Sequence, residues 1–337
     1  MLTIKDIARE SGYSVSTVSR VLNNRRDVSP IAKKRIEGIV AANHFVPNVN
    51  AKHLKQMVSK SIVVLVKGTS NMLFANIVEE IQKRVERTKY TAIVSYLDED
   101  DNEVEQALTV CRERKPLGLL FLGGNPDFFK QKFGEVSIPC VLVTNQAKDM
   151  QFPNLSSVAT DDIAAAKCAV DYLIERGHTN IGILGGDLTS SYTSIQRFYG
   201  CEQSFLNHGL FFDAKTHYSK ARFSYDSAYR AMMWLLESVH DITAVFTMSD
   251  VMAIGAVRAL CDSHLNVPND ISVIGFDGIT LAEYYNPKLT TIQQQYKILA
   301  SRSLEILLND ITLNGVPVHE IVPFHLMQGE SVKNCNR

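Results

Sequence analysis

The 337-residue sequence lacks any apolar segment of the roughly 18–20 residues that would cross a bilayer as a helix. Its first residues, MLTIKDIARE, carry charges where a secretory signal would be apolar. Six cysteines are scattered without a C-x-x-C pair, which favours buried free thiols over a disulfide framework or a zinc site. These absences predict a cytoplasmic protein that has no membrane span and binds no metal.

Catalytic and cofactor motifs are also missing from the sequence. It contains no G-x-x-x-x-G-K-[ST] phosphate loop, no G-x-S-x-G elbow and no H-E-x-x-H helix. The glycine-rich stretch at 182–186 lacks the spacing of a dinucleotide-binding loop. We therefore expect no catalytic residue and no cofactor.

Charge is distributed unevenly along the chain, although the formal net charge is only −1. Residues 1–60 contain 11 Lys and Arg against 4 Asp and Glu, whereas the remainder contains 24 basic and 32 acidic residues. A small basic head on a large acidic body is expected when the head alone meets a polyanion such as nucleic acid.

The basic head is predicted to be helical throughout. Thr3 is a plausible N-cap for a first helix that ends near Gly12, and Ser14 or Ser16 would cap a second helix. Pro30 stands in the first turn of a third helix. Two short helices around a Gly-containing turn are typical of a helix-turn-helix, but a small bundle that only packs on another domain fits equally well.

From residue 62 onwards, β-branched runs alternate with helical segments. The strands expected in the first round are 62–66, 91–96, 117–122 and 139–143, and those in the second are 180–184, 217–220, 244–248 and 272–276. Strands alternating with helices predict an α/β fold with doubly wound parallel sheets. The two rounds predict two similar lobes.

Small polar residues follow most of these strands, for example Gly123–Asn125 and Gly185–Asp187. Ligands of open parallel sheets bind beyond the carboxyl ends of the strands, so two such rims facing each other would form a cleft. The rims are neutral to mildly acidic, which favours a polyhydroxylated or amine-bearing ligand over a phosphate. The small polar residues after any one strand could equally be there only to form a turn.

Several motifs resemble the lactose/galactose-repressor family of bacterial transcription regulators over essentially the whole chain. TIKDIA at 3–8, GYS at 12–14 and TVSRVLN at 17–23 match the family's DNA-binding signature nearly residue for residue. FVPN at 45–48 is similar to its hinge helix, and SVIGFD at 272–277 to its core. The resemblance implies an all-α helix-turn-helix head followed by a two-lobed core like that of periplasmic binding proteins.

The resemblance also implies a division of the chain into domains. A DNA-binding domain would span 1–46, a hinge helix or linker 47–60, and an effector-binding and dimerisation core 61–337. Lobe one of the core would comprise about 61–158 and 292–318, and lobe two about 159–290 and 319–337.

For the head, the family pattern implies that Val15, Ser16 and Arg20 contact bases. The residues implied to hold phosphates or cap helices are Thr3, Ser14, Thr17, Ser19 and Asn23. Leu54 would insert as an apolar wedge into a central minor-groove step, with Ala51 beside it.

For the core, the pattern implies eight effector-binding residues: Phe74, Thr144, Asn145, Arg197, Phe223, Ser249, Asp250 and Asp277. Arg197 and Asp277 match the main polar anchors. Thr144 stands where the family often has an acid, and Ser249 where it usually has an asparagine. The effector is therefore expected to differ from the family's best-known sugars or to bind in a shifted pose.

The sequence thus predicts a homodimeric repressor of a carbohydrate-utilisation operon. It would bind near-palindromic double-stranded DNA and a sugar or sugar derivative. The chain ends at Arg337 without a leucine heptad tail, which favours a dimer over a tetramer. The alternatives are a solute-binding protein, disfavoured by the basic head and the absent signal peptide, and an enzyme, disfavoured by the absent nucleophile–base pair.

Overall fold

The computed structural model describes residues 4–22, 28–43, 60–239, 241–313 and 315–336. The chain divides into two compact units, Met1–Val58 and Ser59–Arg337, here called the head and the core. In the described ranges, no helix combines the length and the apolar character needed to span a membrane.

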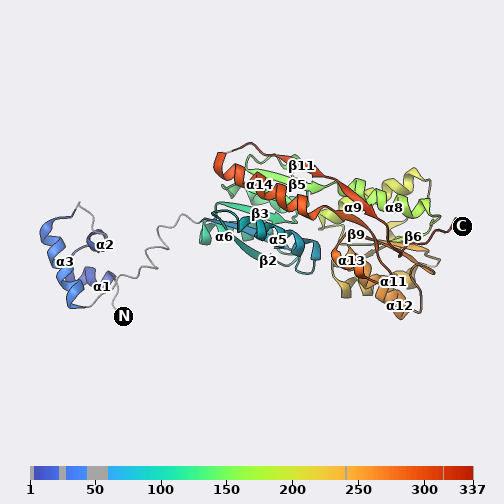
Figure 1. Cartoon of the computed structure of the whole chain (residues 1–337), viewed down its shortest axis with the longest axis horizontal. Helices are drawn as coiled ribbons and strands as arrows, with labels where there is room; N and C mark the ends of the chain where they lie inside the picture. The colour runs from blue at the N-terminus through green and yellow to red at the C-terminus, as the bar shows by residue number, and fades with distance from the viewer. Residues whose placement is uncertain (1–3, 23–27, 44–59, 240, 314, 337) are drawn as a thin grey trace. The chain divides into compact units, whose positions relative to one another are not determined.

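The head contains the three predicted helices, α1 (Ile4–Ser11), α2 (Val15–Leu22) and α3 (Pro30–Ala42) (Figure 1). Ser14 is the cap of α2, since its hydroxyl accepts from the backbone N–H of Thr17 at 3.2 Å. Ile7, Val18 and Ile36, one residue from each helix, are fully buried and form the centre of a small core. The predicted Thr3 cap and the predicted hinge helix lie outside the described residues.

Lobe one of the core contains a six-stranded parallel sheet with the strand order β11-β5-β4-β3-β1-β2. The strands are β1 (Ser61–Lys67), β2 (Thr91–Leu97), β3 (Gly118–Leu122), β4 (Cys140–Val143), β5 (Leu155–Thr160) and β11 (His319–Val322). Its helices are α5 (Met72–Val85), α6 (Glu103–Arg114), α7 (Pro126–Lys132) and α14 (Tyr296–Leu313), with 3-10 turns at Phe133–Glu135 and Lys148–Met150. The run Ile62–Val66 is fully shielded, as expected for a strand covered on both faces.

Lobe two contains a second six-stranded sheet, with the order β12-β10-β9-β8-β6-β7. The strands are β6 (Ile181–Gly185), β7 (Tyr218–Lys220), β8 (Ala244–Thr247), β9 (Ser272–Asp277), β10 (Thr290–Gln294) and the antiparallel β12 (Phe324–Met327). Its helices are α8 (Asp162–Glu175), α9 (Tyr192–Asn207), α10 (Ala214–His217), α11 (Tyr225–Ser238), α12 (Asp250–Asp262) and α13 (Thr280–Tyr284). The prediction of two doubly wound lobes is confirmed.

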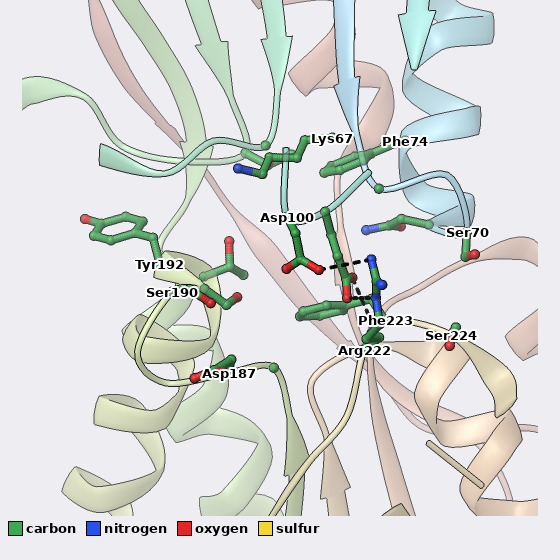
Figure 2. Close-up of a pocket in the computed structure, with 18 of the residues that line it drawn as sticks. Lys67, Ser70, Phe74, Asp100, Asp187, Ser190, Tyr192, Arg222, Phe223 and Ser224 are labelled. Atoms are coloured by element: carbon green, nitrogen blue, oxygen red, sulfur yellow. Dashed lines mark hydrogen bonds and ion pairs between the residues drawn. The ribbon is translucent and has the colours of Figure 1, made fainter. Parts of the chain in front are cut away.

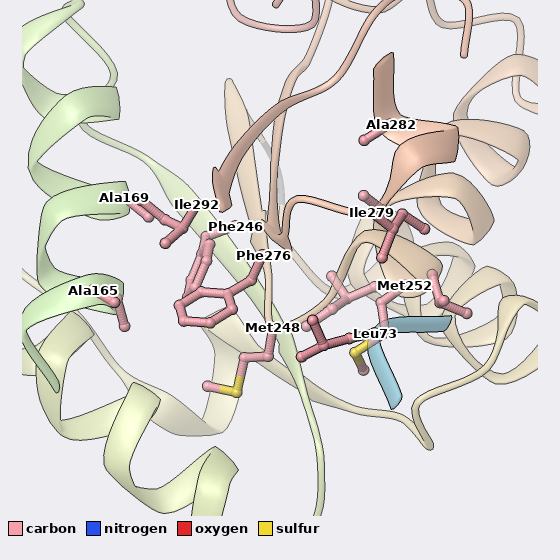
Figure 3. Packing of buried hydrophobic residues seen from close by; sticks show 14 of the residues in the cluster. Leu73, Ala165, Ala169, Phe246, Met248, Met252, Phe276, Ile279, Ala282 and Ile292 are labelled. Carbon is pink, nitrogen blue, oxygen red and sulfur yellow. The ribbon is translucent and has the colours of Figure 1, made fainter. Parts of the chain in front are cut away.

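The interior of lobe two is closely packed around two aromatic rings from neighbouring strands (Figure 3). Phe246 and Phe276 lie 6.4 Å apart between ring centroids, and Ala165 and Ala169 of α8 face them. Gly200 of α9 lets α8 approach closely, because a Cβ atom there would stand 2.3 Å from a backbone oxygen of α8. This packing fixes the strand ends from which the functional residues emerge.

The predicted lobe boundaries are wrong at two places. Strand β11 (His319–Val322) lies in lobe one and not in lobe two, and residues 292–294 belong to β10 of lobe two and not to lobe one. Two side-chain contacts hold β11 at the edge of the lobe-one sheet. His319 Nδ1 lies 2.8 Å from Ser157 Oγ, and Arg302 of α14 pairs with Glu320 at 2.6 Å. The chain therefore crosses between the lobes after β5, after β10 and between β11 and β12.

Candidate functional site

A cavity of about 510 Å³ lies between the strand ends of the two lobes (Figure 2). Lobe one contributes the residues that follow β1, β2 and β3, and lobe two those that follow β6 and β7 together with the ends of β9 and β10. The cavity is therefore where open parallel sheets are expected to bind ligands, at the carboxyl ends of their strands.

Five of the eight predicted effector-binding residues line this cavity: Phe74, Thr144, Arg197, Phe223 and Asp277. Phe74 and Phe223 supply an aromatic surface from each lobe, so a ligand in the cavity can contact an apolar face on both sides. Asn145, Ser249 and Asp250 are not part of the lining.

Ser249 and Asp250 have structural contacts instead, so their assignment to effector binding is corrected here. Ser249 caps α12 by accepting from the backbone N–H of Met252 at 3.2 Å. The fully buried Asp250 carboxylate accepts from Thr291 Oγ1 at 2.6 Å and from the Ile279 backbone N–H at 2.8 Å. Burial raises the pKa of Asp250 well above its usual range.

Asn145 joins the two lobes beside the cavity. Its Nδ2 donates to the Gly124 carbonyl in lobe one at 3.3 Å and to Thr193 Oγ1 in lobe two at 3.2 Å. Asn125 makes a second bridge, because its Nδ2 donates to the Ser190 carbonyl at 3.1 Å. Asn145 therefore belongs to the contacts that hold the lobes together.

Asp277 and Gln294 form the polar floor of the cavity on the lobe-two side. Gln294 Nε2 donates to Asp277 Oδ1 at 2.9 Å, and both side chains are buried. Asp277 Oδ2 and Gln294 Oε1 accept no hydrogen bond from any residue that the structure describes. Buried acceptors are rarely left unpaired, and both residues line the cavity, so these two oxygens are candidate acceptors for a ligand.

The Asp277 carboxyl also titrates in an unusual range. Burial raises its pKa from 3.8 to about 7, and the nearby Arg197 charge and the Gln294 hydrogen bond oppose that rise. Asp277 has a φ of +109°, which turns the chain sharply at the end of β9.

Arg197 is held by the interior of lobe two and not by Asp277. Its Nε donates to Asp162 Oδ1 at 2.8 Å, and its Nη1 donates to the Met248 carbonyl. Its guanidinium carbon lies 3.6 Å from the centroid of the Phe276 ring. Arg197 is therefore both a wall of the cavity and a structural centre of the lobe.

Arg222 lines the cavity from lobe two (Figure 2). Its guanidinium pairs with Asp98, Glu99 and Asp100, the acidic segment that follows β2 in lobe one. The Phe223 backbone N–H also donates to Glu99 Oε2 at 3.4 Å. These contacts tie the acidic segment to one aromatic wall of the cavity.

The positive charges of the lining are all paired with carboxylates. The pairs are Lys67–Glu103, Arg197–Asp162, Lys220–Asp187 and Arg222 with its three acids. The cavity therefore offers a phosphate no unpaired cation. Within the parts of the chain that are described, no cluster of His, Cys, Asp or Glu could hold a metal ion.

In the head, one side of α2 is exposed and carries the residues predicted to contact bases. Val15 is 42% exposed, and Ser16 and Arg20 are also exposed, whereas Val18 and Val21 face the interior. Positions 16 and 20 are one helical turn apart and so share a face. Ser14 also bonds to Ser16 Oγ at 2.7 Å and to Thr17 Oγ1 at 2.9 Å. Of the other predicted DNA contacts, Thr3, Asn23, Ala51 and Leu54 lie outside the described residues.

Comparison with known proteins adds independent evidence. Residues 3–48 match the lacI family of bacterial regulatory proteins, and residues 170–332 match a periplasmic binding protein-like domain. The transcriptional regulator MalR of Clostridium butyricum is 36% identical over 99% of this chain and 100% of its own length. This chain belongs to the LacI family. The predicted family, fold class and role as a DNA-binding transcriptional regulator are thereby confirmed.

One further relative and two solved structures are also similar to this chain. Catabolite control protein A of Priestia megaterium is 30% identical over 93% of this chain and 95% of its own length. The structure of a transcriptional regulator CelR-cellobiose complex is 26% identical, has a TM-score of 0.70, and covers 98% of this chain and 100% of that one. A lac repressor dimer bound to operator and an anti-inducer shares the fold at 24% identity, with a TM-score of 0.70 and coverage of 98% and 99%.

Several polar residues of this LacI-family cleft were not predicted to bind the effector, among them Lys67, Lys220, Arg222 and Gln294. Gln294 belongs to β10, and its place beside Asp277 depends on the pairing of β10 with β9, which no local sequence signal shows. Lys67 ends β1, and its burial beside Glu103 depends on a helix that starts 36 residues later.

We expect Arg222→Glu to shift the cleft towards an open arrangement. The substitution places a carboxylate against three others, Asp98, Glu99 and Asp100, and like charges at this separation repel. Small-angle X-ray scattering of the ligand-free protein should show a larger radius of gyration at low salt, with the difference shrinking as salt screens the repulsion.

Arg230→Glu is the matched control, because Arg230 is an exposed arginine of the same lobe that pairs with Asp226 on its own helix, α11. Identical scattering from both variants at low salt would show that Arg222 does not hold the lobes together.

Proposed function

We propose that this protein is a homodimeric repressor of a carbohydrate-utilisation operon, controlled by an uncharged, polyhydroxylated effector that binds between the lobes of its core. One observation carries the effector class: Asp277 Oδ2 and Gln294 Oε1 are buried acceptors with no donor among the described residues, in a cavity whose lining cations are paired with carboxylates. A sugar hydroxyl donates to such oxygens and brings no charge that would have to be neutralised.

The relatives support this effector class. A regulator of similar fold and 26% identity was solved as a complex with cellobiose. Phe74 and Phe223 would pack against the apolar faces of a sugar ring. We place the protein in the cytoplasm, where it meets operator DNA, and we assign it no catalytic activity and no cofactor.

Control of DNA binding would follow from lobe closure. Two copies of α2 would occupy successive major grooves of a near-palindromic operator, with base contacts from Val15, Ser16 and Arg20. Paired Leu54 side chains would form a wedge in the minor groove between them. An effector that changes the angle between the lobes would change the spacing of these elements, so that effector and operator binding become coupled.

Arg20→Ala should weaken binding to the selected operator by about 1–3 kcal/mol, the discrimination that a bidentate arginine–guanine contact supplies. Random DNA should be bound almost as before, because the lost contact is to a base. Fluorescence anisotropy with the selected operator and with random DNA of equal length measures both quantities. An equal loss on the two DNAs would place Arg20 on the phosphate backbone.

The same titrations, repeated over a range of salt concentrations, test DNA binding itself. The logarithm of the affinity should fall with the logarithm of the salt concentration, with a slope of about −0.9 for each phosphate neutralised. A slope near zero would contradict a role for the basic head in DNA binding.

A further inference from the structure

Lys67 ends β1 and forms part of the cavity wall in lobe one, together with a buried carboxylate. Its Nζ lies 2.6 Å from Glu103 Oε2, and the two side chains are only 12% and 1% exposed. The ammonium also lies 4.7 Å from the centroid of the Phe128 ring. Figure 2 places Lys67 on the lobe-one side, across the cavity from Asp187 and Ser190.

Glu103 is fixed more tightly than its partner. It is the first residue of α6, where the helix N-terminus stabilises a carboxylate. Its second oxygen, Oε1, accepts from the Asn125 backbone N–H at 2.5 Å. Both carboxylate oxygens are therefore engaged, whereas the lysine ammonium has three N–H donors and gives one of them to Glu103.

Stability alone does not account for this pair. Removing two charges from water costs about as much as their attraction returns, and apolar residues of similar volume often stabilise a fold equally well or better. What the pair adds is a donor of fixed position on the cavity wall. The two opposite charges cancel, so this donor does not attract a phosphate.

We propose that Lys67 contacts the effector as the hydrogen-bond donor of lobe one and that Glu103 is its positioning residue. The inference rests on the proposed function and extends it, since the effector must then present an acceptor oxygen towards Lys67 and donor hydroxyls towards Asp277 and Gln294. A sugar hydroxyl or ring oxygen meets the first requirement. The ligand then connects the two lobes through groups of opposite hydrogen-bonding character.

The test compares two double variants of the full-length protein. Lys67→Met/Glu103→Gln removes both charges at similar volume, and the new glutamine can still accept from the Asn125 N–H. Lys132→Met/Glu105→Gln makes the same two changes in an exposed pair, 2.7 Å apart, which joins α7 to α6 outside the cavity lining. Ribose, glucose, maltose and cellobiose serve as probes, by thermal shift first and then by titration calorimetry.

We expect the probe that most stabilises the wild-type protein to bind the Lys67→Met/Glu103→Gln variant at least tenfold more weakly. The ligand-free melting temperatures of the wild type and both double variants should stay close together. The Lys132→Met/Glu105→Gln control should bind the probe as the wild type does.

Unchanged probe affinity in the Lys67→Met/Glu103→Gln variant would overturn the role of Lys67 and leave the proposed effector class standing. If no probe shifts the wild-type transition, the proposed effector class itself is contradicted, and the role given to Lys67 with it. The two failures are therefore distinguishable.

Discussion

Arg197→Ala is expected to lower the free energy of unfolding by about 3–5 kcal/mol, the cost of leaving a buried charge without its partner. The arginine and Asp162 are only 5% and 8% exposed, so the carboxylate left behind is poorly hydrated. The Met248 carbonyl would lose a donor as well. Urea denaturation with an unchanged m-value measures this loss.

Two further variants separate the causes. Lys220→Ala should have little effect on stability, because Lys220 and Asp187 form an exposed pair, 65% and 37% accessible. Arg197→Met combined with Asp162→Asn should recover most of the stability lost in Arg197→Ala, since no buried charge remains. If Arg197→Ala unfolds like the wild type but no longer responds to the effector, Arg197 is a ligand anchor and not a structural residue.

Asp277→Asn should nearly abolish the effector response while leaving operator affinity in the absence of effector close to that of the wild type. A hydrogen bond to a charged group contributes about 1.5–3 kcal/mol, which corresponds to a loss of effector affinity of roughly ten- to a hundredfold. Asparagine tolerates positive φ better than most residues, so the turn at the end of β9 should be kept. Calorimetric titration of the best-binding sugar measures the loss.

The affinity of wild-type protein for that sugar should also depend on pH. Ligand hydroxyls donate to the ionised carboxylate, and the pKa of Asp277 is about 7, so affinity should rise as pH increases towards about 7 and then level off. The charged groups that act on the Asp277 carboxyl are Asp162 and Arg197, whereas its hydrogen-bond partner Gln294 does not titrate. In Asp277→Asn the dependence should flatten, whereas an unchanged pH profile in that variant would assign it to another group.

The stability of the ligand-free protein should show the opposite trend. The pKa of the Asp277 carboxyl is about 7 in the folded protein and has its ordinary value of 3.8 in the unfolded chain. The folded state therefore binds more protons between these values, so the contribution of Asp277 to stability falls as pH rises through this window and is constant above it.

Local signals predicted much of the fold. The helices α6 and α11 begin directly after Asn102 and Ser224, whose side chains cap them, so their starts depend on local signals. Strand β5 was missed, since its sequence LSSVAT is too polar to resemble a buried strand. Its place inside the sheet depends on β4 and β11, and the second of these lies about 160 residues away in the chain.

The candidate site shows the same division between local and distant information. The resemblance to the family pointed to Arg197 and Asp277, and both line the cavity. It could not show that Arg197 pairs with Asp162, 35 residues earlier, or that Gln294 lies beside Asp277. Ser249 and Asp250 follow a strand as ligand-binding residues do, yet they cap and anchor a helix.

The central claim is that binding of a sugar in the cleft changes binding of DNA by the head. It is tested by titrating full-length protein onto a labelled, selected operator with and without a saturating concentration of the sugar that stabilises it. The account predicts a change in operator affinity of about 5–150-fold, a coupling of about 1–3 kcal/mol, that is lost in Asp277→Asn. Equal operator affinity with and without a sugar that is shown to bind would contradict it.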